Sequence, residues 1–238
     1  MQGIALFDWD MISDAEIRSI PKHFDRVYLC VEDRHVPFRA ENVIEMVDKL
    51  KSLNLEVVLN PWGVGNLFAG ESISTVFGYV PWVELAHKTN ADGIMLDEPK
   101  NADNVAYMVR EARVHAPGKF IHLAIQPEKD PARFSKLVDE VSVSTYLFGS
   151  QIVPETTRED VEARVEKWSA FVPDGSSVWV QAWKVPQGAE LVPVWMIQAW
   201  QDRGIDVNIW GWKACKTVSS IRPYNPERVW SNILNALP

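Results

Sequence analysis

The sequence predicts an α/β protein folded as a single (β/α)8 barrel, and three observations support this fold class. Eight short apolar runs alternate with amphipathic segments along the 238 residues. No linker rich in Gly, Ser or Pro divides the chain, so residues 1–238 are expected to form one domain. A doubly wound open sheet, the alternative, usually carries a glycine fingerprint after its first strand, whereas Asp8-Trp9-Asp10 stands at that place here.

The eight apolar runs are expected to be strands because each is short and is bounded by polar or turn-forming residues. Strands that alternate with helices pair in parallel through right-handed crossovers, and eight such units close into a barrel. The expected strands cover residues 4–7, 26–31, 56–59, 94–96, 120–125, 140–146, 178–182 and 205–209.

Helices are predicted between these runs from their start and stop signals. Ser13 with Glu16, and Thr156 with Glu159, have the spacing of a capping box. Gly204 is expected to end a helix. Three more helices are expected to begin at the capping residues Asn101, Asp130 and Asn225. The predicted helices cover residues 14–20, 41–53, 80–88, 101–115, 130–138, 156–171, 189–203 and 225–237.

Composition excludes several classes of partner. The net charge is −8 and Lys and Arg are scattered, which disfavours nucleic acid. No apolar run approaches the ~20 residues of a membrane span, and no secretory leader precedes Ile4, so a cytoplasmic protein without a membrane partner is expected. Cys30 and Cys215 do not form a disulfide framework. Neither a phosphate-binding glycine loop nor a zinc-type histidine set is present, so no cofactor is expected. The sequence does not indicate an oligomeric state.

Acids and tryptophans gather where the predicted strands end. In a (β/α)8 barrel the active site forms at the carboxyl ends of the strands. Eleven Trp in 238 residues is a high content, and a flat indole with one N–H donor can stack on the apolar face of a sugar ring. Candidate substrate-binding residues at these ends are Trp9, Asp10, Glu32, Asn60, Trp62, Gln126, Gln181, Trp183, Lys184, Trp210 and Trp212.

The candidate catalytic residues are carboxylic acids. Cleavage of a glycosidic bond needs one protonated acid for the leaving oxygen and a second group that supports the cationic sugar. The fourth apolar run ends in Asp97-Glu98-Pro99, and mutual repulsion between adjacent carboxylates would raise one pKa, as an acid catalyst requires. The full candidate catalytic set is Glu98, Asp97, Asp8 and Tyr146.

The segment Asp92-Gly93-Ile94-Met95-Leu96-Asp97-Glu98-Pro99 resembles the fourth-strand signature of (β/α)8-barrel glycoside hydrolases. In clan-A families this strand ends in Asn-Glu-Pro, and the resemblance implies that Glu98 is the proton donor. Those families place a nucleophilic Glu at the end of strand seven, where this chain has Gln181-Ala182-Trp183-Lys184.

Family-18 chitinases are similar in a different way. Their fourth strand begins with Asp-Gly and ends in acids, and they carry a Tyr on strand six and a Trp after strand eight. The matching residues here are Asp92-Gly93, Tyr146, and Trp210 or Trp212. Both resemblances imply a glycosidase that acts on an oligo- or polysaccharide, and neither identifies the sugar.

Other readings of the same residues stay open. An inverting mechanism would take its base from Asp8, Asp10 or Glu32, across the mouth. Asp8 and Glu32 with Asp97 or Glu98 could instead hold Mg²⁺ or Mn²⁺ through oxygen ligands. A Schiff-base lyase would use Lys184 or Lys213. The non-enzymatic alternative is a sugar-binding barrel without a catalytic pair.

Overall fold

The computed structural model describes residues 1–7, 9–31, 40–61, 80–99, 105–146, 152–211 and 223–237. Of Asp10 and residues 80–82 it describes the backbone alone. No helix in these ranges is long and apolar enough to cross a membrane.

The strands form one closed barrel in which every neighbouring pair is parallel, in the order β1-β2-β3-β4-β5-β6-β7-β8. This confirms the predicted (β/α)8 fold. β1 closes the ring against β8 through the pairs Gly3 with Asn208 and Ile4 with Ile209. Gly3 is needed at this seam because a Cβ atom there would collide with the Asn208 side chain. The strands are β1 Gly3–Leu6, β2 Arg26–Cys30, β3 Glu56–Asn60, β4 Gly93–Asp97, β5 Phe120–Ile125, β6 Glu140–Ser144, β7 Ser177–Gln181 and β8 Val207–Trp210.

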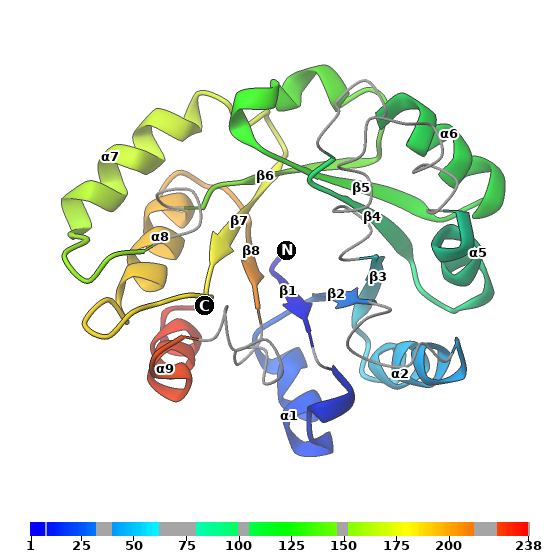
Figure 1. The fold of residues 1–238 in the computed structure, drawn as a ribbon, viewed down its shortest axis with the longest axis horizontal. Helices are drawn as coiled ribbons and strands as arrows, with labels where there is room; N and C mark the ends of the chain where they lie inside the picture. Colours follow the sequence, from blue (N-terminus) through cyan, green and yellow to red (C-terminus); the bar gives the residue numbers. More distant parts are fainter. Residues whose placement is uncertain are drawn as a thin grey trace.

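The α-helices surround the strands and follow one another around the ring in chain order (Figure 1). They cover the outward faces of the strands, where residues such as Leu29 and Ile94 are fully buried. The helices are α1 Asp14–Ser19, α2 Ala40–Ser52, α5 Val80–Lys88, α6 Val105–His115, α7 Arg158–Ser169, α8 Val192–Gln201 and α9 Pro226–Ala236. Short 3-10 helices are η1 Trp9–Met11, η2 Ile20–Lys22, η4 Pro127–Lys129 and η5 Pro131–Phe134.

Several predicted helix ends are confirmed. Ser13 and Glu16 form a capping box in which each side chain accepts the other residue's backbone N–H. Asn225 caps α9 by accepting the N–H of Arg228. Gly204 lies just past α8 with φ of 71°. The predicted cap Asn101 lies outside the described residues.

The predicted helix over 130–138 is wrong. Asp130 has φ of 52° and its side chain makes no capping hydrogen bond, and only Pro131–Phe134 forms a single 3-10 turn. After this turn, the hydrogen bond from the Leu137 N–H to the Phe134 carbonyl again spans only three residues. The left-handed Asp130 separates η4, at Pro127–Lys129, from η5, so the connection to β6 consists of short 3-10 turns rather than an α-helix.

Two other helix starts are shifted. Thr157 rather than Thr156 caps α7, and it forms its capping box with Asp160. Thr156 instead bonds the backbone of Val153. Thr156 with Glu159 and Thr157 with Asp160 both have capping-box spacing, and spacing alone does not show which pair caps the helix. α8 starts at Val192 rather than at residue 189, after a turn.

The amino-terminal half of the barrel interior is filled by a hydrogen-bonded network. Arg26 reaches across the barrel, with its Nε 2.9 Å from Glu56 Oε2 and an Nη1 2.5 Å from Glu140 Oε2. The His122 ring is 2.6 Å from Ser142 Oγ, which also accepts the Trp179 indole N–H at 2.7 Å. The floor network is defined as Arg26, Tyr28, Glu56, His122, Glu140, Ser142 and Trp179.

Candidate functional site

The carboxyl ends of the eight parallel strands meet at one end of the barrel, which we call the mouth. Asp97 is the last residue of β4 and continues the inward series begun by Gly93 and Met95. Its side chain faces Asn60 at the end of neighbouring β3. The mouth residues are Asn60, Asp97, Glu98, Gln126, Ser144, Tyr146, Gln181 and Trp183.

Glu98 follows Asp97 in a left-handed conformation. Strand alternation would turn its side chain out of the barrel, but φ of 42° bends the backbone at this residue. The Glu98 N–H still donates to the Ala124 carbonyl of β5 at 2.9 Å. Glu98 Oε2 lies 3.5 Å from the Gln126 side-chain amide, so the carboxyl reaches the end of β5. Both acids of the pair therefore belong to the mouth. Left-handed backbone outside glycine is uncommon and clusters at functional sites.

The protein around the two carboxyl groups changes their proton affinity, although both residues keep some exposure to the mouth. Burial raises the pKa of Asp97 well above its usual range, and the neighbouring Glu98 charge adds to this rise while Asn60 opposes it. Burial also raises the pKa of Glu98, and the Ser144 hydroxyl and the Lys129 ammonium oppose that rise. The pair therefore retains a proton at higher pH than ordinary carboxyls do, which is the property of a general acid.

Two aromatic side chains border the acid pair. Burial and the charges of Glu98 and Asp97 raise the pKa of Tyr146, so its phenol stays a neutral hydroxyl. Tyr146 packs edge-on against Trp183 with ring centroids 5.8 Å apart. Lys184 places its Nζ 5.2 Å from the centre of the Trp183 ring and has φ of 50°. A second unusual backbone conformation thus lies at the end of β7.

Buried polar atoms without a partner are concentrated at the mouth. A buried N–H or oxygen without a hydrogen bond costs about 1 to 3 kcal/mol, so native proteins keep few of them. Asn60 and Gln181 are fully buried and Ser144 is 4% exposed. Among the described residues, the mouth atoms that lack a hydrogen-bond partner are Asn60 Oδ1, Glu98 Oε1, Gln181 Oε1 and Trp183 Nε1. A hydroxyl-rich ligand would satisfy this mixture of acceptors and a donor.

Two of the predicted sugar-binding tryptophans are packed inside the protein. Trp9 is 7% exposed and its indole N–H donates to the Cys30 carbonyl at 2.9 Å. Trp210 is 6% exposed and packs edge-on between Phe7 and Trp179, at the base of the mouth. These contacts favour a packing role for Trp9, whereas Trp210 belongs to the buried cluster against which Tyr146 and Trp183 pack.

Part of the predicted site lies outside the described residues. These positions are Asp8, Glu32, Trp62, Trp212, Lys213 and Cys215. Only the backbone of Asp10 is described. No group of three or more His, Cys, Asp or Glu within the described ranges could hold a metal ion. That finding leaves the Mg²⁺ or Mn²⁺ hypothesis a prediction, because it depends on Asp8 and Glu32.

Sequence reasoning missed Ser144 and Lys129. Ser144 is the last residue of β6, two positions after inward-facing Ser142, so strand alternation would have placed it at the mouth. Lys129 lies at the end of η4, and its Nζ donates to the Pro99 carbonyl at 2.9 Å. No spacing signal identified Lys129, because the position depends on a 3-10 turn that was not predicted.

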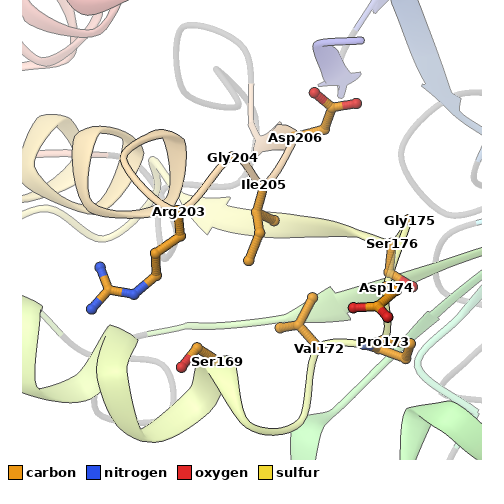
Figure 2. Close-up of a pocket in the computed structure, with 10 residues that line it drawn as sticks. All are labelled: Ser169, Val172, Pro173, Asp174, Gly175, Ser176, Arg203, Gly204, Ile205 and Asp206. Carbon is orange, nitrogen blue, oxygen red and sulfur yellow. The ribbon is translucent and has the colours of Figure 1, made fainter.

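A pocket of about 500 Å³ lies at the opposite end of the barrel. Figure 2 shows that its lining comes from the end of α7, the end of α8 and the segments that lead into β7 and β8. Arg203 pairs with Glu166 at 2.7 Å, and Asp206 pairs with the amino group of Met1 at 2.8 Å. Each of these two charged side chains is therefore paired with a group outside the pocket lining. The chemistry described above therefore lies at the mouth rather than in this pocket.

Comparison with known proteins identifies the fold. No protein-family model matches the sequence, and no curated protein matches it either. A GH5_18 protein from Streptomyces cattleya, solved with Manβ1-4GlcNAc, has a TM-score of 0.62 at 15% identity, over 96% of this chain and 76% of that chain. Thermotoga maritima Cel5A, solved with mannotriose, has a TM-score of 0.60 at 13% identity, over 100% and 97% of the two chains. Thiamine phosphate pyrophosphorylase from Pyrococcus furiosus has a TM-score of 0.52 at 12% identity, over 100% and 96%.

At identities this low, the likenesses show the fold alone, which is a (β/α)8 barrel. One barrel fold carries many chemistries, so the reaction has to be argued from the mouth itself.

Proposed function

We propose that the protein is a glycosidase-like enzyme that acts on an oligo- or polysaccharide, with the Asp97–Glu98 pair supplying the proton for the leaving group. The observation that carries this proposal is the pair itself: two adjacent carboxyls at the mouth, both with raised pKa values. Unsatisfied polar atoms surround the pair, as expected around the position of a ligand rich in hydroxyl groups.

Each described mouth residue has a role in this proposal. Glu98 is the first candidate for the proton donor because its Oε1 lacks a hydrogen-bond partner among the described residues and the residue is only partly buried. Burial and the neighbouring Glu98 charge raise the pKa of Asp97, so we assign it the role of a neutral hydrogen-bond donor beside Glu98. Tyr146 donates its phenolic hydrogen, and Trp183 offers an indole N–H and an aromatic face. The second catalytic group is proposed to be Asp8 or Asp10, with Glu32 as the further candidate.

The acceptor-rich mouth favours neutral sugars over phosphorylated substrates. Asn60 Oδ1 and Gln181 Oε1 can only accept hydrogen bonds, so they match donors such as hydroxyl groups. A phosphate group brings further acceptors and negative charge close to two carboxyls, where repulsion opposes binding. The two sugars found with the solved barrels, Manβ1-4GlcNAc and mannotriose, are therefore reasonable first probes.

The test is hydrolysis and binding of these oligosaccharides by wild type and by Glu98→Gln. Removal of a general acid costs about 10²- to 10⁴-fold in turnover, whereas the isosteric amide keeps the shape of the site and should leave sugar affinity within a few-fold. Glu159→Gln is the matched control, because it removes an exposed carboxyl on α7. It should leave both quantities unchanged.

Three outcomes separate the candidates. Loss of turnover with retained binding supports the proposal. Equal turnover in wild type and Glu98→Gln contradicts the role of Glu98. Sugar binding without turnover in either protein indicates a sugar-binding barrel, a reading favoured by the buried amide Gln181 at the end of β7.

A further inference from the structure

The 3-10 turn that follows β5 holds the segment that contains Glu98. Gln126 precedes η4 in an extended conformation, and Lys129 ends η4 three residues later. Both side chains reach the segment Glu98–Pro99, since the Gln126 amide contacts Glu98 Oε2 and the Lys129 ammonium donates to the Pro99 carbonyl at 2.9 Å.

Glu98 needs such support because its backbone conformation is unfavourable. A residue with a Cβ atom at φ of 42° is held there only when its neighbours determine the conformation. The Glu98 N–H donates to the Ala124 carbonyl on one side of the turn, and Lys129 holds the Pro99 carbonyl on the other side. Both anchors come from β5 and η4, so one segment of the chain fixes the turn at both ends.

The charged and titratable groups around Glu98 come from three elements. Asp97 lies on β4, Tyr146 follows β6, and Glu128 with Lys129 belongs to η4. Gln126 and Ser144 add uncharged polar groups. Within this described set Lys129 is the cation, and it is half-buried.

We propose that Lys129 is a positioning residue for Glu98, because its ammonium group holds the Pro99 carbonyl that closes the left-handed turn and faces the Glu98 carboxyl with a positive charge. The catalytic meaning of this assignment depends on the proposed function, but the structural claim does not. Lys129 touches no reacting atom. It acts through the acid, whose direction and proton affinity it sets.

This arrangement balances two opposing effects on the acid. Burial raises the pKa of Glu98, and the Lys129 charge opposes that rise. An acid that also has to release its proton in each cycle needs a pKa near the working pH, so burial without a nearby cation would hold the proton too tightly. Lys129 thus keeps a buried carboxyl able to titrate.

The experiment measures the Glu98 pKa directly by carbon-13 NMR of labelled carboxyl groups during a pH titration of the full chain. Lys129→Met removes both the charge and the donor, and an upward shift of the Glu98 pKa is expected. Lys129→Arg keeps both and should leave the pKa near its wild-type value. Lys136→Met is the matched control, because Lys136 is exposed on the same connection.

A further variant separates charge from hydrogen bonding and provides a second test should Lys129→Met not fold. Lys129→Gln keeps a donor for the Pro99 carbonyl without the charge, and it should still raise the Glu98 pKa. An unchanged Glu98 pKa in a folded Lys129→Met or Lys129→Gln protein overturns the proposal. If wild type neither binds nor cleaves sugars, the proposed function fails while the NMR result still decides the role of Lys129. If it does cleave them, the alkaline limb of the pH–rate profile should move to higher pH in Lys129→Met.

Discussion

The two ends of the barrel interior use buried polar side chains in opposite ways. In the floor network the polar groups are paired: Arg26 contacts Glu56, Glu140 and Tyr28. At the mouth, Asn60 Oδ1 and Gln181 Oε1 are fully buried and lack partners among the described residues. β3, β6 and β7 supply residues to both sets, only one or two inward-facing positions apart.

This difference indicates what each end does. Paired buried charges hold the barrel together, because removing one partner leaves the others desolvated and uncompensated. Unpaired polar atoms weaken the folded state and are retained where a ligand completes them. Stability is therefore concentrated at the amino-terminal end, and the candidate chemistry at the carboxyl-terminal end, as is usual for this fold.

Arg26→Met should have the largest effect, because it leaves the Glu56 and Glu140 carboxylates facing each other without their cation. We expect the free energy of unfolding to fall by about 3 to 5 kcal/mol, measured by urea denaturation at neutral pH. Arg158→Met, which removes an exposed pair with Glu162, is the control and should cost less than about 1 kcal/mol. If Arg26→Met lowers the free energy of unfolding by less than about 1 kcal/mol, the floor network does not stabilise the barrel as proposed.

Acidification should lower the free energy of unfolding by a second, smaller amount, because it protonates a carboxylate of the floor network. Burial tends to raise the pKa of Glu140, but its bonds to His122 and Arg26 outweigh burial and hold the pKa at about 2. Burial also lowers the pKa of His122, so Arg26 is the permanent cation. Because the pKa of Glu140 is lower in the folded state than its usual 4.5, its contribution is complete above about pH 4.5 and is lost as the pH falls toward about 2.

This linkage contributes on the order of 3 kcal/mol. It can be measured as the difference in unfolding free energy between wild type and Glu140→Gln at pH 6 and again at pH 3. The difference should shrink at the lower pH. A difference that does not change with pH would mean that Glu140 is not ionised in the folded protein.

The comparison is sharpest at two serines on one strand. Ser142 bonds His122 and Trp179 in the floor network, whereas Ser144, two residues later on the same inward face, faces the Glu98 carboxyl at the mouth. Ser142→Ala should lower the free energy of unfolding by about 1 to 3 kcal/mol, because it leaves those partners unsatisfied. Ser144→Ala should leave stability unchanged or raise it by up to about 1 kcal/mol. Equal losses in thermal or chemical denaturation would contradict the distinction between floor and mouth.

Much of the fold could be predicted because periodicity and capping are local. The expected strand over 120–125 and helix over 80–88 match β5 and α5 at both ends. The prediction failed at Asp130, where a plausible cap followed by proline instead adopts a left-handed conformation in a short connection. Both flanking strands were placed correctly, so the failure lies in the backbone conformation of Asp130, which the capping signal does not determine.

The candidate site could be predicted less completely. Parallel pairing placed Asp97, Tyr146 and Gln181 at one mouth, as expected from the strand ends. The direction of Glu98 could not be foreseen, because alternation points it outward and only the turn at φ of 42° returns it. The floor network was missed as well, since Arg26 and Glu56 looked like the polar starts of strands, and their contact with Glu140 is set by barrel closure.

Closure between β1 and β8 also has a consequence for how the barrel is made. The pair Gly3 with Asn208 joins residues 205 positions apart, and Gly3 allows the two strands to approach at that seam. Non-local pairing of this kind delays folding, because a long loop has to close before the contact stabilises it. On a ribosome the ring cannot be completed until β8 has emerged, so the backbone N–H and C=O groups on that edge of β1 remain unpaired with β8 through most of synthesis.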